Sequence, residues 1–357
     1  MALTMMFAVV TVAVAFGVLF RVEQVVAWGA DGHRVTCLIA EPLLYEPTKQ
    51  AIAALLPKSA NGNLADLCTW PDDVRWMDKY KWTRELHWVN TPNHVCKYDY
   101  NRDCHDHMGT PNVCISGAIN NFTHILWNHT RNRNMKNGRV GVRTNVFEDL
   151  AWFSIELTST LKPATRKRIH SDSGSSSYGS SSDIFTCYRA FVFGEAEDVT
   201  EALLFLAHFM GDIHQPLHTG FRSDQGGNNI SVYWYHRRSD LHHVWDTEIV
   251  SKALKENHNS DPEIMADSIL NNATDNWASE VDAWGICHNR KLSCPDTYAT
   301  ESINLACKWA YSGAAPGTAL GDEYYTSRLP TVELRLAQGG VRLAAILNSI
   351  FDPNAPQ

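Results

Sequence analysis

The sequence predicts a mainly α-helical protein. Its long segments with apolar residues at helical spacing are HRVTCLIAEPLL at 33–44, TEALLFLAHFMGDI at 200–213 and VELRLAQGGVRLAAILNSIF at 332–351. We expect Thr200 to be the N-cap of the second segment. Alternating strand patterns are few, and NISVYWY at 229–235 is the best short candidate. The 357 residues, of which 44% are hydrophobic, allow one large domain or two with a sizeable core.

The N-terminal segment is expected to be an export signal. Residues 2–20 carry no charge, and the small residues Val25 and Ala27 suit cleavage before Trp28. The alternative is an uncleaved membrane anchor, because the apolar run is long and lacks a basic start. Nine cysteines and four N-x-S/T sequons agree with export. We therefore expect a glycoprotein of the secretory pathway, secreted or vacuolar, with sequons at Asn121, Asn128, Asn229 and Asn272.

The net charge is −8, and no long run of Lys or Arg occurs. This balance argues against a protein that coats duplex nucleic acid mainly through phosphate contacts. It does not exclude an enzyme that grips a few nucleotides through a metal and a stacking ring.

One segment, from about 138 to 197, lacks the helical period. It contains SDSGSSSYGSSSD at 171–183, which is too polar to offset the entropy of ordering and is expected to be a mobile surface loop. Cys187 lies close by and is the candidate for an unpaired thiol, because nine cysteines leave one over when the rest pair.

Spaced histidines and aspartates predict a metal site. His208 and Asp212 are four residues apart and share a helical face, and an unpaired aspartate in an apolar helix is costly. His242 and Asp246 repeat this spacing, and His218 follows after the helix breaks at HQP. For one isolated pair, a hydrogen-bonded core histidine would be the better interpretation. Two pairs with a third histidine favour a metal, and imidazole with carboxylate suits zinc.

Further ligands are expected near the cleaved N-terminus and in two short motifs. An α-amine has a pKa of about 7.7–8.0, so the nitrogen and carbonyl oxygen of Trp28 could chelate a metal, with His33 one helical turn on. Asp72 in WPDDVRW and His87 in ELHWVNTP are also candidates. Taken alone, Asp72 would be interpreted as a turn or N-cap carboxylate.

With these residues, the chain resembles the type I nucleases (the S-one/P-one group), zinc-dependent single-strand nucleases of fungi and plants, and most of all the plant bifunctional nucleases. The resemblance runs from Trp28 to about Phe351, outside the Ser-rich segment. Its motifs, in order, are WGADGH, WPDDVR, LHWVNTP, HFMGDIHQPLH, GGNNI, LHHVWD and ATESINLACKWAY. After the expected signal peptide at 1–27, it implies a single helical domain at 28–357. This domain would be built around a cleft with three zinc ions and would carry an atypical insertion at about 138–197.

The resemblance implies a ligand set for each zinc ion. The first set is Asp72, His87, His208 and Asp212. The second is His218, His242 and Asp246. The third is the amine and carbonyl of Trp28, with His33 and a bridging Asp212, so that Asp212 would hold two ions.

The implied activity is hydrolysis of single-stranded DNA and RNA to 5′-phosphoryl products, together with 3′-nucleotidase activity. Zinc-activated hydroxide would attack phosphorus in line, with Asp72 and Arg75 as catalytic residues. Trp88 would stack on an unpaired base, and Asn90 stands where many relatives carry an aspartate that reads the base edge. An amide donates as well as accepts, so the base preference stays open. Without the resemblance, Arg75 would be interpreted as a surface arginine and Trp88 as a core aromatic.

The resemblance also implies disulfides and leaves alternatives for the whole chain. The implied pairs are Cys37–Cys68, Cys96–Cys307, Cys104–Cys114 and Cys287–Cys294, with no counterpart for Cys187. The 138–197 segment is either a tolerated insertion or a retained intron. A zinc-dependent phospholipase C and an inactive secreted glycoprotein disrupted by that segment are the competing interpretations. We expect a monomer without a stable protein partner.

Overall fold

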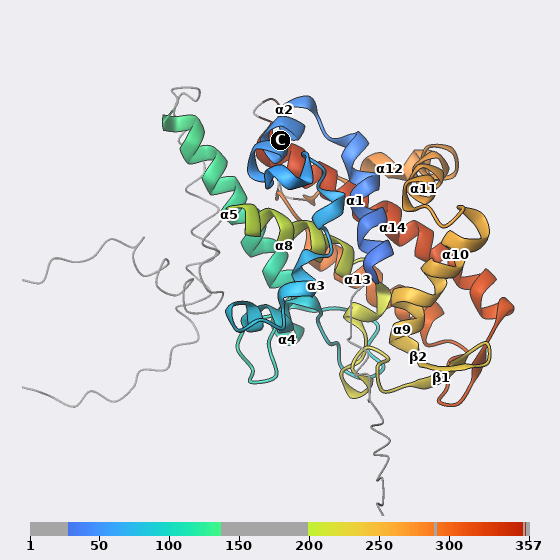
Figure 1. The fold of residues 1–357 in the computed structure, drawn as a ribbon. Coiled ribbons are helices and arrows are strands. Elements are labelled where there is room, and N and C mark those ends of the chain that lie inside the picture. The colour runs from blue at the N-terminus through green and yellow to red at the C-terminus, as the bar shows by residue number, and fades with distance from the viewer. Residues whose placement is uncertain (1–27, 137–198, 289–290, 353, 355–357) are drawn as a thin grey trace, which may run out of the picture.

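The computed structural model describes residues 28–136, 199–288, 291–352 and 354 (Figure 1). The expected signal peptide at 1–27, Cys187 and the segment at 138–197 lie outside these residues, so the interpretations given for them above stay predictions. Among the described residues, no helix is both long and apolar enough to cross a membrane.

The fold is mainly helical, as predicted. The helices in chain order are α1 (Ala30–Ala40), α2 (Glu46–Leu55), α3 (Trp70–Val74), α4 (Tyr100–Asp103), α5 (Ile115–Lys136), α8 (Val199–Asp212), α9 (Leu241–His243), α10 (Ile249–Asn257), α11 (Pro262–Asn276), α12 (Ala278–Trp284), α13 (Pro295–Leu305) and α14 (Asp322–Phe351). Shorter helical turns connect them, including a 3₁₀ helix at Asp78–His87 and a π-helical turn at Val244–Glu248.

The core is arranged around α8 and α14, which run through the middle of the molecule in Figure 1, with α1 and α5 packed beside them. Every residue of α8 from Ala202 to Asp212 is buried, and a helix that is apolar on all sides belongs inside a core. Thr200 lies within α8, so the expectation that it is the N-cap was wrong. Its hydroxyl instead donates to the carbonyl of Leu55, 2.7 Å away.

A small sheet of strand order β2-β1-β3 lies at one edge of the molecule. Strands β1 (Ser231–Trp234) and β2 (Arg237–Asp240) form an antiparallel hairpin, and β3 (Ala319–Leu320) pairs in parallel with β1. The strand predicted at 229–235 is therefore confirmed. The hairpin leads directly into α9 and the π-helical turn, a type of distortion that is frequent at functional sites.

Four disulfides join the loops and helices: Cys37–Cys68, Cys96–Cys307, Cys104–Cys114 and Cys287–Cys294. They are the pairs that the family resemblance implied. The first one ties α1 to the segment that precedes α3, and so it holds together two elements that carry candidate metal ligands.

Candidate metal centre

The carboxylate of Asp212, at the end of α8, lies at the centre of the site and is fully buried. Its Oδ1 is 3.1 Å from Nε2 of His33 on α1. Its Oδ2 is 3.0 Å from Nδ1 of His87 and 3.3 Å from Nε2 of His208. Three imidazoles from three segments that are distant in sequence therefore meet one carboxylate.

A second carboxylate approaches the same imidazoles. Asp72 lies on the short helix α3, and its Oδ1 is 3.6 Å from Nδ1 of His87 and 3.7 Å from Nε2 of His208. Nη1 of Arg75, one turn later, lies 3.2 Å from the same oxygen. His33, Asp72 and His208 form one group with metal-ligand spacing, and His87, His208 and Asp212 form another.

The third group with metal-ligand spacing consists of His218, His242 and Asp246. Nε2 of His242 lies 3.2 Å from Oδ2 of Asp246, and Nε2 of His218 lies 3.8 Å from Oδ1. The π-helical turn positions Asp246 one turn after His242. All the ligands predicted in the two His-x₃-Asp pairs are therefore brought into buried groups.

Backbone carbonyls fix how three of these histidines point. Nδ1 of His208 donates to the carbonyl of Cys68, and the distance is 2.7 Å. Nδ1 of His218 and of His242 donate over the same distance to the carbonyls of His87 and Gly226. A proton on Nδ1 leaves Nε2 as a lone pair, and in each case Nε2 points at a carboxylate. This orientation is the one that histidine ligands of metals adopt.

Many polar atoms of the site make no hydrogen bond. Among the described residues, the buried atoms without a hydrogen bond include both oxygens of Asp72, Oδ1 of Asp212, and Nε2 of His218 and of His242. Buried polar groups are normally satisfied, so a cluster of unsatisfied acceptors requires another explanation. Lone pairs and carboxylate oxygens that face one another fit a cation between them, and this donor set fits zinc.

Burial raises the pKa values of two carboxyl groups of the site and lowers those of four of its imidazoles. It raises the pKa of Asp72 to about 7, against the opposing effects of His208 and Arg75, and raises that of Asp212 well above its usual range. It lowers the pKa of His218 to about 3. The pKa values of His33, His87 and His208 are also lowered by burial. These four imidazoles are thus neutral at physiological pH, so they cannot balance the negative charge of the ionised carboxylates.

Trp28, the first described residue, lies against this centre. Its side chain is fully buried, and the amide of Gly29 donates to the carbonyl of Asp246 over 2.7 Å.

The ring of His33 stacks on that of His208, with centroids 3.8 Å apart. A Cβ on Gly211 would lie only 2.6 Å from Nδ1 of His33, so α8 needs glycine here to admit that ring.

The predicted substrate residues lie on an extended segment beside the ligands. Val89 donates its amide to the carbonyl of His218, and Thr91 donates to that of Gly220, both over 2.9 Å. Trp88 and Asn90 alternate with these residues and are each half-buried. Trp88 is therefore not a fully buried core aromatic.

The sequence interpretation missed a buried polar network behind the turn that links Asp212 to His218. Nε2 of His214 accepts from Arg342 over 2.9 Å, and the carbonyl of His214 accepts from Arg335 over 3.1 Å. Glu301 binds both guanidiniums, at 2.7 Å from Arg335 and 2.6 Å from Arg342. Gln215, in the same turn, donates to Asp246. The available signal was two arginines seven residues apart on one face of an apolar helix.

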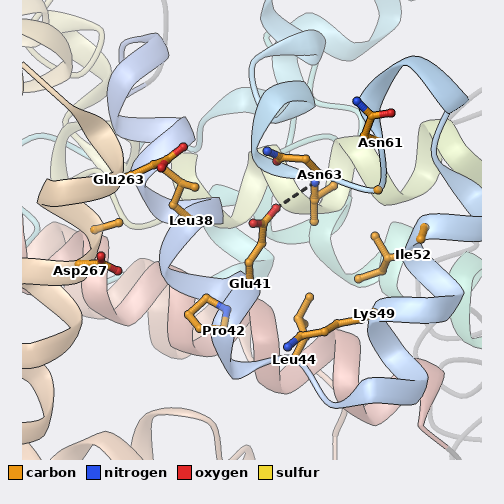
Figure 2. A pocket seen from close by; sticks show the side chains of 14 residues that line it. Leu38, Glu41, Pro42, Leu44, Lys49, Ile52, Asn61, Asn63, Glu263 and Asp267 are labelled. Atoms are coloured by element: carbon orange, nitrogen blue, oxygen red, sulfur yellow. Dashed lines mark hydrogen bonds between the residues drawn. The ribbon is translucent and has the colours of Figure 1, made fainter.

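One pocket of the described residues is separate from this centre. It has a volume of about 650 Å³, lies between α1, α2 and α11, and contains none of the candidate ligands (Figure 2). Its central carboxylate, Glu41, already accepts from the amides of Leu64 and Ala65, at 3.0 and 3.2 Å. Its other acidic groups, Glu263 and Asp267, come from α11 at the rim. The candidate ligands therefore lie outside this pocket.

The sequon asparagines differ in exposure. Asn229 is exposed, whereas Asn121, Asn128 and Asn272 are half-buried on helices. Their glycosylation stays a prediction.

Comparison with known proteins gives one family and several relatives. The family described as S1/P1 Nuclease matches residues 28–150 and 160–352. Endonuclease 4 of Arabidopsis thaliana is 42% identical over 330 residues, which cover 92% of this chain and 91% of that protein. Endonuclease 2 of the same plant is 40% identical over 343 residues, covering 96% and 97%. Nuclease P1 of Penicillium citrinum is 27% identical over 332 residues, covering 90% and 97%.

We expect metal affinity to fall as pH falls. Below about pH 7, a proton occupies Asp72 in the metal-free protein, and burial favours a proton on Asp212 as well. A metal must displace each bound proton, which costs roughly tenfold in affinity per pH unit for each one. Calorimetric titration of chelator-treated protein with Zn²⁺ at several pH values measures this. At 1,000 times Kd, one bound ion adds about 4 kcal/mol to the free energy of unfolding. An affinity that is constant between pH 5 and 8 would contradict the assignment.

Glu301→Gln should weaken the turn between Asp212 and His218. The change leaves two buried guanidiniums without an anion and is expected to lower the free energy of unfolding by about 1–3 kcal/mol. Because Gln215 of the same turn holds Asp246, Zn²⁺ affinity should fall as well. Urea unfolding and metal titration measure the two effects, with the exposed Glu280→Gln as control. A variant that matches the control in both would show that the network does not support the site.

Proposed function

The chain belongs to the S1/P1 nuclease family, and we propose that it is a zinc-dependent nuclease specific for single-stranded DNA and RNA, with 3′-nucleotidase activity. Membership makes it a nuclease, and its buried His/Asp groups are suited to metal. The observation that carries the finer proposal is the meeting of three neutral imidazoles at the fully buried Asp212.

The proposed cofactor is three Zn²⁺ ions. The first ligand set would be Asp72, His87, His208 and Asp212, which adds Asp72 to the group of His87, His208 and Asp212. The second would be the group of His218, His242 and Asp246. The third set would combine His33 and Asp212 with the amine and carbonyl of Trp28, freed by cleavage after Ala27. The burial of Trp28 beside Asp246 supports this third set, because the start of the mature chain would then lie at the metal centre.

The metal ions, when bound, would supply a nucleophile by lowering the pKa of water and would offset the phosphate charge. The side chains of the protein would orient the phosphate of the substrate. Nε and Nη2 of Arg75 are buried and, within the described ranges, make no hydrogen bond, so they can donate to a phosphate oxygen while Nη1 stays at Asp72. Products would carry 5′-phosphates, and 3′-nucleotides would give nucleosides.

Single-strand specificity would come from Trp88. An indole stacks on any base, and stacking is worth about 1–3 kcal/mol per base, but the base must be unpaired to reach it. Asn90 lies two residues further along the same segment and would read the base edge with an amide that both donates and accepts.

Export and cleavage before Trp28 complete the proposal. Four disulfides suit an oxidising compartment, so we propose a secreted or vacuolar enzyme that is glycosylated and acts as a monomer. The phospholipase C alternative gains no support, because the relatives named above are nucleases.

The purified chain should cleave single-stranded DNA and RNA and 3′-AMP, and should leave a duplex of the same sequence intact. Asp212→Asn removes the central carboxylate and should lower kcat/KM on all three substrates by at least about 100-fold, with loss of bound zinc. Asp261→Asn, at the N-cap of α11, is the matched control and should keep both. Hydrolysis of lecithin instead of nucleic acid would favour the phospholipase. Full zinc occupancy without turnover would favour the inactive glycoprotein.

A chain that retains Ala27 should lose the third zinc ion and most activity. The extra residue converts the amine of Trp28 into an amide, which is a poor metal ligand. Metal analysis by mass spectrometry, on samples whose N-terminus is confirmed by sequencing, gives the stoichiometry. Unchanged metal content would argue against the N-terminal chelate while leaving the other two ligand sets in place.

A further inference from the structure

We propose that the exposed indole of Trp76 is a second stacking platform, which binds the base of a nucleotide adjacent to the scissile phosphate. The inference rests on the proposed function and extends it to substrates longer than one nucleotide. It starts from an unusual exposure, because 42% of the Trp76 surface is open to solvent although the preceding residue, Arg75, is only 3% exposed.

Trp76 lies next to the metal centre. The guanidinium carbon of Arg75 is 5.1 Å from the centroid of the indole ring. Nη1 of the same guanidinium is 3.2 Å from Oδ1 of Asp72, a candidate ligand. One side chain therefore spans the distance from the ring to the centre, so a base stacked on Trp76 would belong to a nucleotide close to the reacting phosphate.

Arg84 holds the ring in place. Its guanidinium carbon lies 4.5 Å from the ring centroid, and its Nε donates to the carbonyl of Arg75 over 3.0 Å. Among aromatic rings, indole attracts a cation most strongly, so this guanidinium restrains the orientation of the exposed ring. Arg84 belongs to the 3₁₀ helix that ends at His87. The platform is thus built from the two segments that carry the ligands Asp72 and His87.

The chemistry of the platform selects an unpaired nucleic acid strand. An exposed indole offers a π-face to any base, and two guanidiniums supply positive charge for the backbone phosphates. In a chain of net charge −8, this local positive charge is notable. A base in a duplex is stacked between its neighbours and cannot reach the ring. A mononucleotide that occupies the reacting position has no second base to place there.

The test compares substrates of different length. In Trp76→Ala, kcat/KM on a single-stranded DNA 12-mer should fall by between about 5-fold and about 150-fold, the range expected for one lost stacking contact. For 3′-AMP, kcat/KM should change by less than about 2-fold. Trp76→Phe should recover most of the loss. Tyr233→Ala, which removes an aromatic of similar exposure (45%) on β1, is the matched control and should behave as the unaltered chain.

Each outcome decides the inference. An equal loss on the 12-mer and on 3′-AMP would show that Trp76 only supports Arg75 and would overturn the proposal, as would no loss on either. If the unaltered chain cleaves neither substrate, the proposed function fails. In that case, fluorescence anisotropy with a labelled 12-mer tests the stacking contact directly. The inference requires that Trp76→Ala binds the 12-mer more weakly than Tyr233→Ala does at the same salt concentration.

Discussion

The burial of the Asp212 carboxylate at the end of an apolar helix is the constraint on which the site depends. An ionised carboxylate without compensation is costly inside a protein, and burial raises its pKa accordingly. The imidazoles of His33 and His87 cannot balance the negative charge of Asp212, because burial keeps them neutral. Bound cations resolve both problems, since they satisfy the lone pairs and the carboxylate together. Metal binding and the stability of the native fold are therefore linked in this chain.

The ligand groups are not independent of one another. The carbonyl of His87, a residue of one group, fixes the ring of His218, a residue of another. The carbonyl of Cys68, which is held to α1 by a disulfide, fixes His208. Displacement of one segment would thus misorient ligands on a second one. Such coupling suits chemistry in which several cations must keep fixed positions around one phosphate.

Helical periodicity in the sequence predicted part of the site. The rest depends on how distant segments of the chain pack together, which the sequence does not show. The His208–Asp212 and His242–Asp246 pairs could be predicted because four residues complete about one helical turn. Asp72 and His87 were candidates from their own motifs, but only the family resemblance indicated that they would join these pairs. The network of Glu301, Arg335, Arg342 and His214 was missed because its members are up to 128 residues apart. Contacts of that range depend on how helices pack, and a single sequence has no short pattern for them.

The acidic composition of the chain is compatible with a polyanionic substrate. Three buried aspartates, Asp72, Asp212 and Asp246, contribute to the net charge of −8 but face the metal centre and not the solvent. Three divalent cations, as proposed, would offset six of those eight charges at that one place. The cations would then add positive charge at the centre, beside Arg75 and Arg84. An unpaired strand could enter the centre and stack, whereas a duplex is bound mainly through phosphate contacts along an extended basic surface.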